Sequence, residues 1–213
     1  MVAVSGYAAT GMIDPADMQY GESGLLPCIA QDASTGEVLM LAWVNREAAD
    51  LTVSTGKLHF WSRSRQEIWL KGETSGNVLS VVDLRHDCDA DTLLALVNPA
   101  GPACHEGTRT CFGDPAPGQF SILPSLERTI SARAGDMPDG SWTAKLLSTD
   151  GLAGEKVEEE AEEVARAARD ESDERVANEA ADVIYHLLVL LRTRNMALAD
   201  ALDVLADRAR SDK

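Results

Sequence analysis

The sequence predicts two domains: a mostly β, α+β domain with a mixed sheet over residues 1–112, and an all-α helical bundle over residues 125–213. Before residue 112 the apolar runs are short and bounded by turn residues, as in β-strands. After residue 125 they are longer and recur with helical spacing. Three of the eight prolines fall within residues 113–124, which we interpret as a linker because proline cannot continue a helix or a central strand.

The N-terminal domain is expected to begin with a hairpin of residues 25–31 and 38–44. Asn45 suits the N-cap of a short helix that ends at Gly56. Residues 1–22 carry little pattern, so the sequence does not distinguish between a short helix and an arm for this segment. The other expected strands are residues 58–61, 68–70, 78–84 and 93–97.

The C-terminal domain is rich in helix-forming residues and is expected to form a bundle. Its acidic helix precedes a strongly apolar one, and alanine, leucine and aspartate recur at helical spacing in the last. The expected helices are residues 125–134, 142–148, 154–169, 176–194 and 198–208.

Composition excludes several classes of function. The 213 residues include 19 Lys and Arg against 35 Asp and Glu, a net charge of -16, which argues against broad binding to nucleic acids or anionic membranes. No uncharged apolar stretch approaches the ~20 residues that span a bilayer, and residues 1–20 lack the pattern of a signal peptide. We therefore expect a cytosolic protein whose four cysteines are free or bound to metal.

Three aspartates and three cysteines form the first candidate site. Asp87, Asp89 and Asp91 offer the oxygen ligands that Mg²⁺ prefers, and Cys88 between them offers a sulfur ligand suited to Zn²⁺. The spacing of Cys88, Cys104 and Cys111 lacks the Cys-x-x-Cys pairs of structural zinc sites, and three cysteines fit a catalytic zinc with one open position. The fourth cysteine, Cys28, is expected to be buried in a strand.

If residues 87–91 are extended, Cys88 lies on the opposite face from the three carboxylates. The two kinds of ligand would then serve separate ions, or Cys88 would meet the other cysteines across a subunit boundary. The alternative is an acidic turn on a solvated surface, near unrelated buried cysteines.

Two loops of this acidic protein carry basic and hydroxyl side chains, which suit a phosphate monoester. The alternative interpretation is that these two loops are ordinary polar turns with no role in binding. The candidate residues are Arg63, Arg65, Lys71 and Ser75.

Four ordered motifs of residues 22–112 resemble the phosphoribosyl-AMP cyclohydrolase family. They are Phe60-Trp61-Ser62-Arg63-Ser64-Arg65, residues 69–77, Asp87-Cys88-Asp89-Ala90-Asp91, and Gly101-Pro102-Ala103-Cys104-His105 with Cys111-Phe112. The resemblance implies hydrolytic opening of the adenine ring of phosphoribosyl-AMP in histidine biosynthesis. It also implies a homodimer whose zinc site draws cysteines from both subunits.

Carried onto matching positions, the resemblance assigns Cys88, Cys104 and Cys111 to zinc and Asp87, Asp89 and Asp91 to Mg²⁺. Zinc would lower the pKa of its bound water for attack on the ring. His105 is the candidate proton shuttle, because imidazole titrates near working pH. Arg63, Arg65, Lys71 and Ser75 would hold phosphates and ribose.

A second set of carboxylates lies on two consecutive helices. Residues three and four apart share a helix face, so Glu159, Glu160 and Glu163 can face Glu179 and Asp182 and hold Mg²⁺. For the glutamate-rich first helix, a solvated face is the alternative. A solvated face explains Glu179 and Asp182 less well, since these two residues lie at the start of an apolar helix, where a buried unpaired charge is costly.

This pair of motifs resembles the MazG-type pyrophosphohydrolases, and residues 126–130, 141–146 and 156–160 are similar to phosphoribosyl-ATP pyrophosphohydrolase. The resemblance covers about residues 124–210 and implies Mg²⁺-assisted attack of water between the α and β phosphates. The five carboxylates would bind Mg²⁺, with Glu163 the candidate to orient the water, and Lys145 and Lys156 would contact phosphate. Trp142, Glu155 and Glu158 depart from the usual tyrosine, lysine and glycine, which affects the phosphate contacts most.

Together the resemblances imply a bifunctional hydrolase whose C-terminal domain acts first on phosphoribosyl-ATP and whose N-terminal domain acts on the product. One alternative is a general nucleotide pyrophosphohydrolase with a structural zinc module. A non-enzyme alternative is an acidic helical dimerisation protein whose folding is stabilised by metal.

Overall fold

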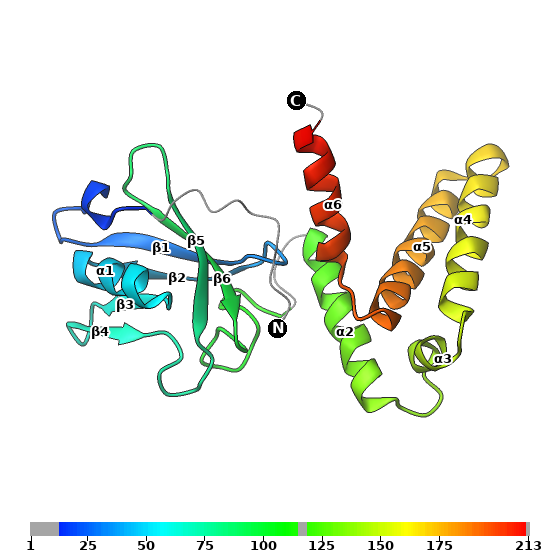
Figure 1. Cartoon of the computed structure of the whole chain (residues 1–213), viewed down its shortest axis with the longest axis horizontal. Helices are drawn as coiled ribbons and strands as arrows, with labels where there is room; N and C mark the ends of the chain where they lie inside the picture. Colours follow the sequence, from blue (N-terminus) through cyan, green and yellow to red (C-terminus); the bar gives the residue numbers. More distant parts are fainter. Residues whose placement is uncertain (1–12, 115–118, 212–213) are drawn as a thin grey trace. The chain divides into compact units, whose positions relative to one another are not determined.

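The computed structural model describes residues 13–114 and 119–211 and divides into two compact units between Ser121 and Ile122 (Figure 1). We call them the β unit and the helical unit. The predicted layout of a mixed sheet followed by a helical region is confirmed. Residues 115–118 of the predicted linker, and residues 1–12 of the segment left open between a helix and an arm, lie outside the described range.

The β unit is built on one six-stranded sheet in the order β4-β3-β2-β1-β6-β5. β1 and β6 pair in parallel and all other neighbours are antiparallel, so the sheet is mixed. The predicted hairpin is the pair β1–β2. The strands are β1 (Leu26–Asp32), β2 (Val38–Val44), β3 (His59–Ser62), β4 (Glu67–Leu70), β5 (Leu79–His86) and β6 (Leu93–Pro99).

The core of the β unit follows the period of two expected of strands with one buried face. Leu26, Cys28 and Ala30 alternate with less buried residues along β1. The prediction that Cys28 is buried is confirmed, since it has no exposed surface. Helix α1 (Arg46–Thr55) packs against β2 and β3. A short 3-10 helix, η1 (Pro15–Asp17), precedes β1.

The ends of α1 have the predicted caps. The Asn45 side chain accepts a hydrogen bond from the backbone N–H of Ala48, and Gly56 ends the helix at a φ of 65°, which glycine adopts without steric cost.

Residues 122–211, the described part of the helical unit, form five α-helices after the 3-10 turn η2 (Gln119–Ser121). α4 and α5 lie side by side and make the most extensive contact between any two elements (Figure 1). Ile130, Leu146 and Val189 are central to its core. The helices are α2 (Ile122–Asp136), α3 (Trp142–Ser148), α4 (Leu152–Asp170), α5 (Asp173–Thr193) and α6 (Leu198–Ser211).

Two features of the helical unit differ from simple expectation. α2 was expected to start at residue 125 but begins at Ile122, because Pro124 lies in the first turn, where its missing N–H has no intrahelical partner to lose. α6 buries none of its residues, although it carries Leu202, Val204 and Leu205. Within residues 13–114 and 119–211, every helix is too short or too polar to cross a bilayer.

Candidate functional site

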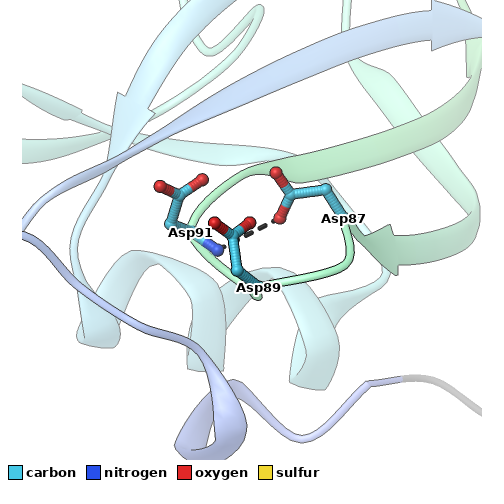
Figure 2. Close-up of side chains that lie close together, drawn as sticks. All are labelled: Asp87, Asp89 and Asp91. Carbon is cyan, nitrogen blue, oxygen red and sulfur yellow. Dashed lines mark hydrogen bonds between the residues drawn. The ribbon is translucent and has the colours of Figure 1, made fainter.

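The acidic loop, residues 87–91, joins β5 to β6 and gathers its three aspartates (Figure 2). One carboxylate oxygen from each of Asp87, Asp89 and Asp91 lies within 4.8 Å of the other two. All three side chains are exposed. The carboxylates predicted for Mg²⁺ therefore meet within a single loop of one chain.

The acidic loop is a turn, so the condition that it be extended is not met. The Asp87 carboxylate accepts hydrogen bonds of 3.1 Å from the backbone N–H groups of Asp91 and Thr92, which closes the turn. Ala90 adopts a φ of 60° within it. The water that its neighbours displace acts to raise the pKa of Asp87, but the N–H groups of Thr92 and Asp91 outweigh this loss of hydration and leave that pKa below its usual value.

The cysteine loop, residues 103–111, brings two of the three candidate zinc ligands together. The thiols of Cys104 and Cys111 are within hydrogen-bonding reach of each other. The backbone N–H of Glu106, followed by the Thr108 hydroxyl, lowers the pKa of Cys104, so its thiolate is favoured. Burial, and then the charge of Cys104, raises the pKa of Cys111.

Cys88 stays on the acidic loop, where it is exposed. Among the described residues, no group of three converging metal-ligand atoms includes a cysteine. A single chain thus supplies two neighbouring thiols and holds the third elsewhere. His105, the candidate proton shuttle, is exposed, and its Nδ1 lies 3.9 Å from the Cys104 sulfur.

The four candidate phosphate contacts of the β unit separate into two groups. Arg63 and Arg65 line a cavity of about 420 Å³ together with three tryptophans, Trp43, Trp61 and Trp69. The Arg63 guanidinium lies 4.9 Å from the Trp43 ring centre, a cation–π contact, and Arg65 pairs with Glu67 at 3.1 Å.

Lys71 and Ser75 do not line this cavity. Lys71 is buried and close enough to Cys111 for its charge to oppose the rise in the pKa of that thiol that burial causes. Ser75 accepts a hydrogen bond from the backbone N–H of Asn77. Asn77 packs so tightly that a Cβ on Gly72 would lie 2.3 Å from its backbone and one on Gly101 2.4 Å from its side chain.

Three of the predicted carboxylates of the helical unit form a second cluster. One oxygen each from Glu160, Glu179 and Asp182 lies within 4.8 Å of the others, across the contact between α4 and α5. We call this the helical carboxylate cluster. Glu179 is only 3 % exposed, and this burial raises its pKa; the charge of Arg175 acts to lower it, and Glu163 acts to raise it.

Glu163 borders the cluster through a hydrogen bond to Glu179 and a 3.6 Å ion pair with Arg175. Glu159 lies outside the cluster, on a more exposed part of α4, and its carboxylate pairs with Lys156 at 2.6 Å. Lys156 also lies 3.5 Å from Glu160. The Lys145 ammonium lies 5.3 Å from the Trp142 ring centre.

Sequence reasoning missed two residues beside the helical carboxylate cluster. Arg175 pairs with Glu179, and buried His186 places its Nδ1 2.9 Å from the Asp182 carbonyl oxygen and 3.9 Å from Glu160. Both stand four positions from a cluster residue on α5, so helical spacing was an available signal. Sequence reasoning also missed Arg109, which pairs with buried Asp32 and gave no local signal.

Two family models match the chain, one in each unit. The model described as phosphoribosyl-AMP cyclohydrolase matches residues 40–113, and that described as phosphoribosyl-ATP pyrophosphohydrolase matches residues 123–209. The first range holds the acidic loop and the cysteine loop, and the second holds the helical carboxylate cluster.

Proteins named "Histidine biosynthesis bifunctional protein HisIE" match nearly the whole chain. That of Bacillus subtilis (strain 168) is 47% identical over 199 residues, which cover 90% of this chain and 95% of the relative. That of Escherichia coli (strain K12) is 48% identical over 187 residues, covering 87% and 91%. That of Halalkalibacterium halodurans is 43% identical over 204 residues, covering 91% and 96%. With identity this high over both units, the chain belongs to the HisIE family of bifunctional histidine-biosynthesis proteins.

Proposed function

We propose that the helical unit hydrolyses phosphoribosyl-ATP to phosphoribosyl-AMP and pyrophosphate, and that the β unit then hydrolytically opens the adenine ring of phosphoribosyl-AMP. The observation that carries this proposal is that each unit gathers its own cluster of metal-binding side chains inside the range of the matching family model. We further propose that the helical unit is of the MazG type and that the enzyme acts in the cytoplasm, where its free thiols stay reduced.

The helical carboxylate cluster has the chemistry of a Mg²⁺ site. Octahedral Mg²⁺ binds oxygen at about 2.0–2.1 Å, so its ligands lie about 3–4 Å apart. Oxygens already within 4.8 Å need only small movements to reach that spacing. When bound there, Mg²⁺ would neutralise charge on the triphosphate. Glu163, beside the cluster, is the candidate to orient the attacking water, with Lys145 and Lys156 as candidates for phosphate. We keep Glu159 as a candidate ligand that would have to leave Lys156.

In the β unit, Asp87, Asp89 and Asp91 have the same donor chemistry and spacing for Mg²⁺. Cys104 and Cys111 offer neighbouring thiols, one with a lowered pKa, which suits zinc. When bound there, zinc would supply a water of lowered pKa for attack on the adenine ring. His105, adjacent to the thiols, is the candidate to move the proton. Arg63, Arg65, Lys71 and Ser75 are the candidates for phosphate and ribose.

We propose a homodimer in which Cys88 of one subunit joins Cys104 and Cys111 of the other. Cys88 is exposed and stands apart from the thiol pair of its own chain, so a second chain can supply the third thiolate. The apolar residues of α6, of which none is buried, also favour an additional contact in the helical unit.

The two-step activity is tested by incubating the full chain with phosphoribosyl-ATP, Mg²⁺ and Zn²⁺ while pyrophosphate release and adenine-ring absorbance are followed. We expect pyrophosphate first and ring opening second. Turnover of ordinary nucleoside triphosphates without any change in phosphoribosyl-AMP would favour the general pyrophosphohydrolase. If neither substrate is consumed by folded protein, the non-enzyme alternative holds.

The shared zinc site is tested by mixing two inactive variants, Cys88→Ala and Cys104→Ala, under conditions that exchange subunits. A heterodimer then contains one intact site, so a random mixture should recover about a quarter of the wild-type ring-opening rate. The matched mixture of Cys104→Ala with Cys111→Ala should recover nothing, because both changes lie in the same half-site. Equal results from the two mixtures would contradict a site built from two chains.

A further inference from the structure

A cluster of buried charges joins the turn between β1 and β2 to the cysteine loop. Asp32 is 1 % exposed and Glu37 4 % exposed. Arg109 donates a hydrogen bond to Asp32, and its Nε lies 3.6 Å from Glu37. Buried carboxylates are costly unless they are paired, so this arrangement strongly favours one position of the Arg109 guanidinium.

The turn that receives Arg109 is itself fixed. The Oδ1 atom of Asp32 makes its hydrogen bonds within the turn. It accepts from the N–H and the hydroxyl of Ser34 at 2.9 and 2.7 Å, and from the N–H of Thr35 at 3.2 Å. Asp32 thus keeps Oδ2 for Arg109 while Oδ1 closes the turn. The carboxylate that anchors Arg109 is therefore held by the hydrogen bonds of its own turn.

Arg109 lies within the cysteine loop, between the two thiols. Its carbonyl oxygen accepts a 3.1 Å hydrogen bond from the N–H of Ala103, the residue before Cys104. On the other side, the N–H of Cys111 donates to the Leu39 carbonyl of β2 at 2.8 Å. The Arg109 side chain therefore ties the Cys111 end of the cysteine loop to the turn after β1, and the Arg109 backbone ties this end to the Cys104 end.

We infer that Arg109, held by Asp32 and Glu37, is a positioning residue that sets the spacing of the Cys104 and Cys111 thiols for zinc. This inference rests on the proposed function, in which these thiols hold the metal. Tetrahedral zinc requires sulfur atoms at about 2.3 Å from the ion, and residues that orient the ligands affect metal affinity almost as directly as the ligands do. The contacts recorded for the Arg109 side chain are with Asp32 and Glu37, so it would act on the thiols through the conformation of the loop.

The test compares full-length variants that differ in charge and shape at this cluster. Arg109→Lys keeps the charge but loses the forked geometry. Arg109→Gln combined with Asp32→Asn removes the hydrogen-bonded pair of charges together, so that Asp32 is not left charged and without its arginine. The matched control is Arg85→Gln, because Arg85 also pairs with a buried aspartate, Asp83, at 2.8 Å but lies on β5 outside the cysteine loop.

Three measurements are made on each variant. Zinc affinity is obtained by competition with a chromogenic chelator, and Co²⁺-loaded protein is examined for thiolate-to-metal charge-transfer absorption. Thermal unfolding is followed by tryptophan fluorescence, which reports mainly on the β unit because three of the four tryptophans, Trp43, Trp61 and Trp69, lie there.

We expect the double variant to bind zinc roughly 10- to 100-fold more weakly and to have a weakened Co²⁺ charge-transfer band while it remains folded. Arg109→Lys should recover part of the affinity, and Arg85→Gln should match the wild type. The inference is overturned if folded Arg109 variants retain wild-type zinc affinity and Co²⁺ spectra, or if Arg85→Gln weakens zinc to the same degree. Zinc affinity that survives Cys104→Ala in the parent protein would instead refute the proposed zinc site itself.

Discussion

The acidic loop and the helical carboxylate cluster gather the same kind of ligand in different ways. In the loop, neighbouring residues supply all three carboxylates, and backbone N–H groups fix their arrangement. In the helical unit the ligands come from α4 and α5, are partly buried, and are accompanied by Arg175 and His186. The first cluster depends on one turn, whereas the second depends on the packing of two helices. The difference predicts that changes to the two sites act independently and that the second, which depends on helix packing, is linked more strongly to the stability of its unit.

The largest expected effect separates the two sites by activity. Cys104→Ala should reduce the rate of ring opening by about a hundredfold or more. It should leave pyrophosphate release intact, because the thiol belongs only to the β unit. Glu160→Gln should do the reverse. Both products are measured on each variant, with Cys28→Ala and the exposed Glu162→Gln as matched controls. Loss of both activities in either folded variant would contradict two independent sites.

A smaller effect tests how closely the loops around the thiols are packed. Gly72→Ala should destabilise the β unit well beyond the ~1 kcal/mol of a left-handed conformation, because the new Cβ would meet the Asn77 backbone at 2.3 Å. Gly24→Ala is the control, since Gly24 has a similar φ of 70° and open space around it. Unfolding is followed by tryptophan fluorescence. Equal losses for the two variants would mean that the close approach to Asn77 is unimportant.

A modest effect tests the link between the helical cluster and stability. The pKa of Glu179 is higher in the folded protein than its value of about 4.5 in the unfolded chain. In metal-free protein, the contribution of Glu179 to stability should therefore be full below pH 4.5 and should be lost as the pH rises through the folded-state pKa. Glu179→Gln should therefore raise the Tm of the metal-free protein at neutral pH and remove the stabilisation by Mg²⁺. The exposed Glu174→Gln on the same helix is the control. A lower Tm for Glu179→Gln across the whole pH range would refute this.

The smallest effect is a difference in chemical reactivity within the β unit. In metal-free protein near neutral pH, iodoacetamide should modify Cys104 before Cys111, because the pKa of the first is lowered and that of the second raised. Cys28, fully buried and with its pKa raised by that burial, should react only on unfolding. Peptide mass spectrometry gives the order of modification. Faster reaction at Cys111 would contradict the hydrogen bonding described for the cysteine loop.

Local patterns in the sequence were sufficient for most elements and for the aspartates of the acidic loop. The strands alternate, Asn45 and Gly56 cap α1 as expected, and Asp87, Asp89 and Asp91 are too near in sequence to separate far. The conformation of the loop was not predictable from alternation alone, because the Asp87 side chain bonds to backbone N–H groups and closes a turn.

Contacts between distant segments were beyond the sequence. Nothing near Arg109 in the sequence indicates Asp32, because an ion pair between residues 77 positions apart is set by tertiary structure. The separation of Glu159 from Glu160 also depends on which side of α4 meets α5, although both glutamates lie in one acidic run. The sequence pattern thus identified the candidate residues, and the packing of the two helices determines which of them reach the carboxylate cluster.

The parallel pairing of β1 with β6 has a consequence for how the chain acquires its structure. These strands come from opposite ends of the β unit's sequence, so joining them closes a long loop and is expected to be slow, whereas the β5–β6 hairpin forms from neighbours. During synthesis the aspartate turn can thus form early on the ribosome, while the sulfur ligands downstream reach their sheet-anchored positions only after the central strands have met.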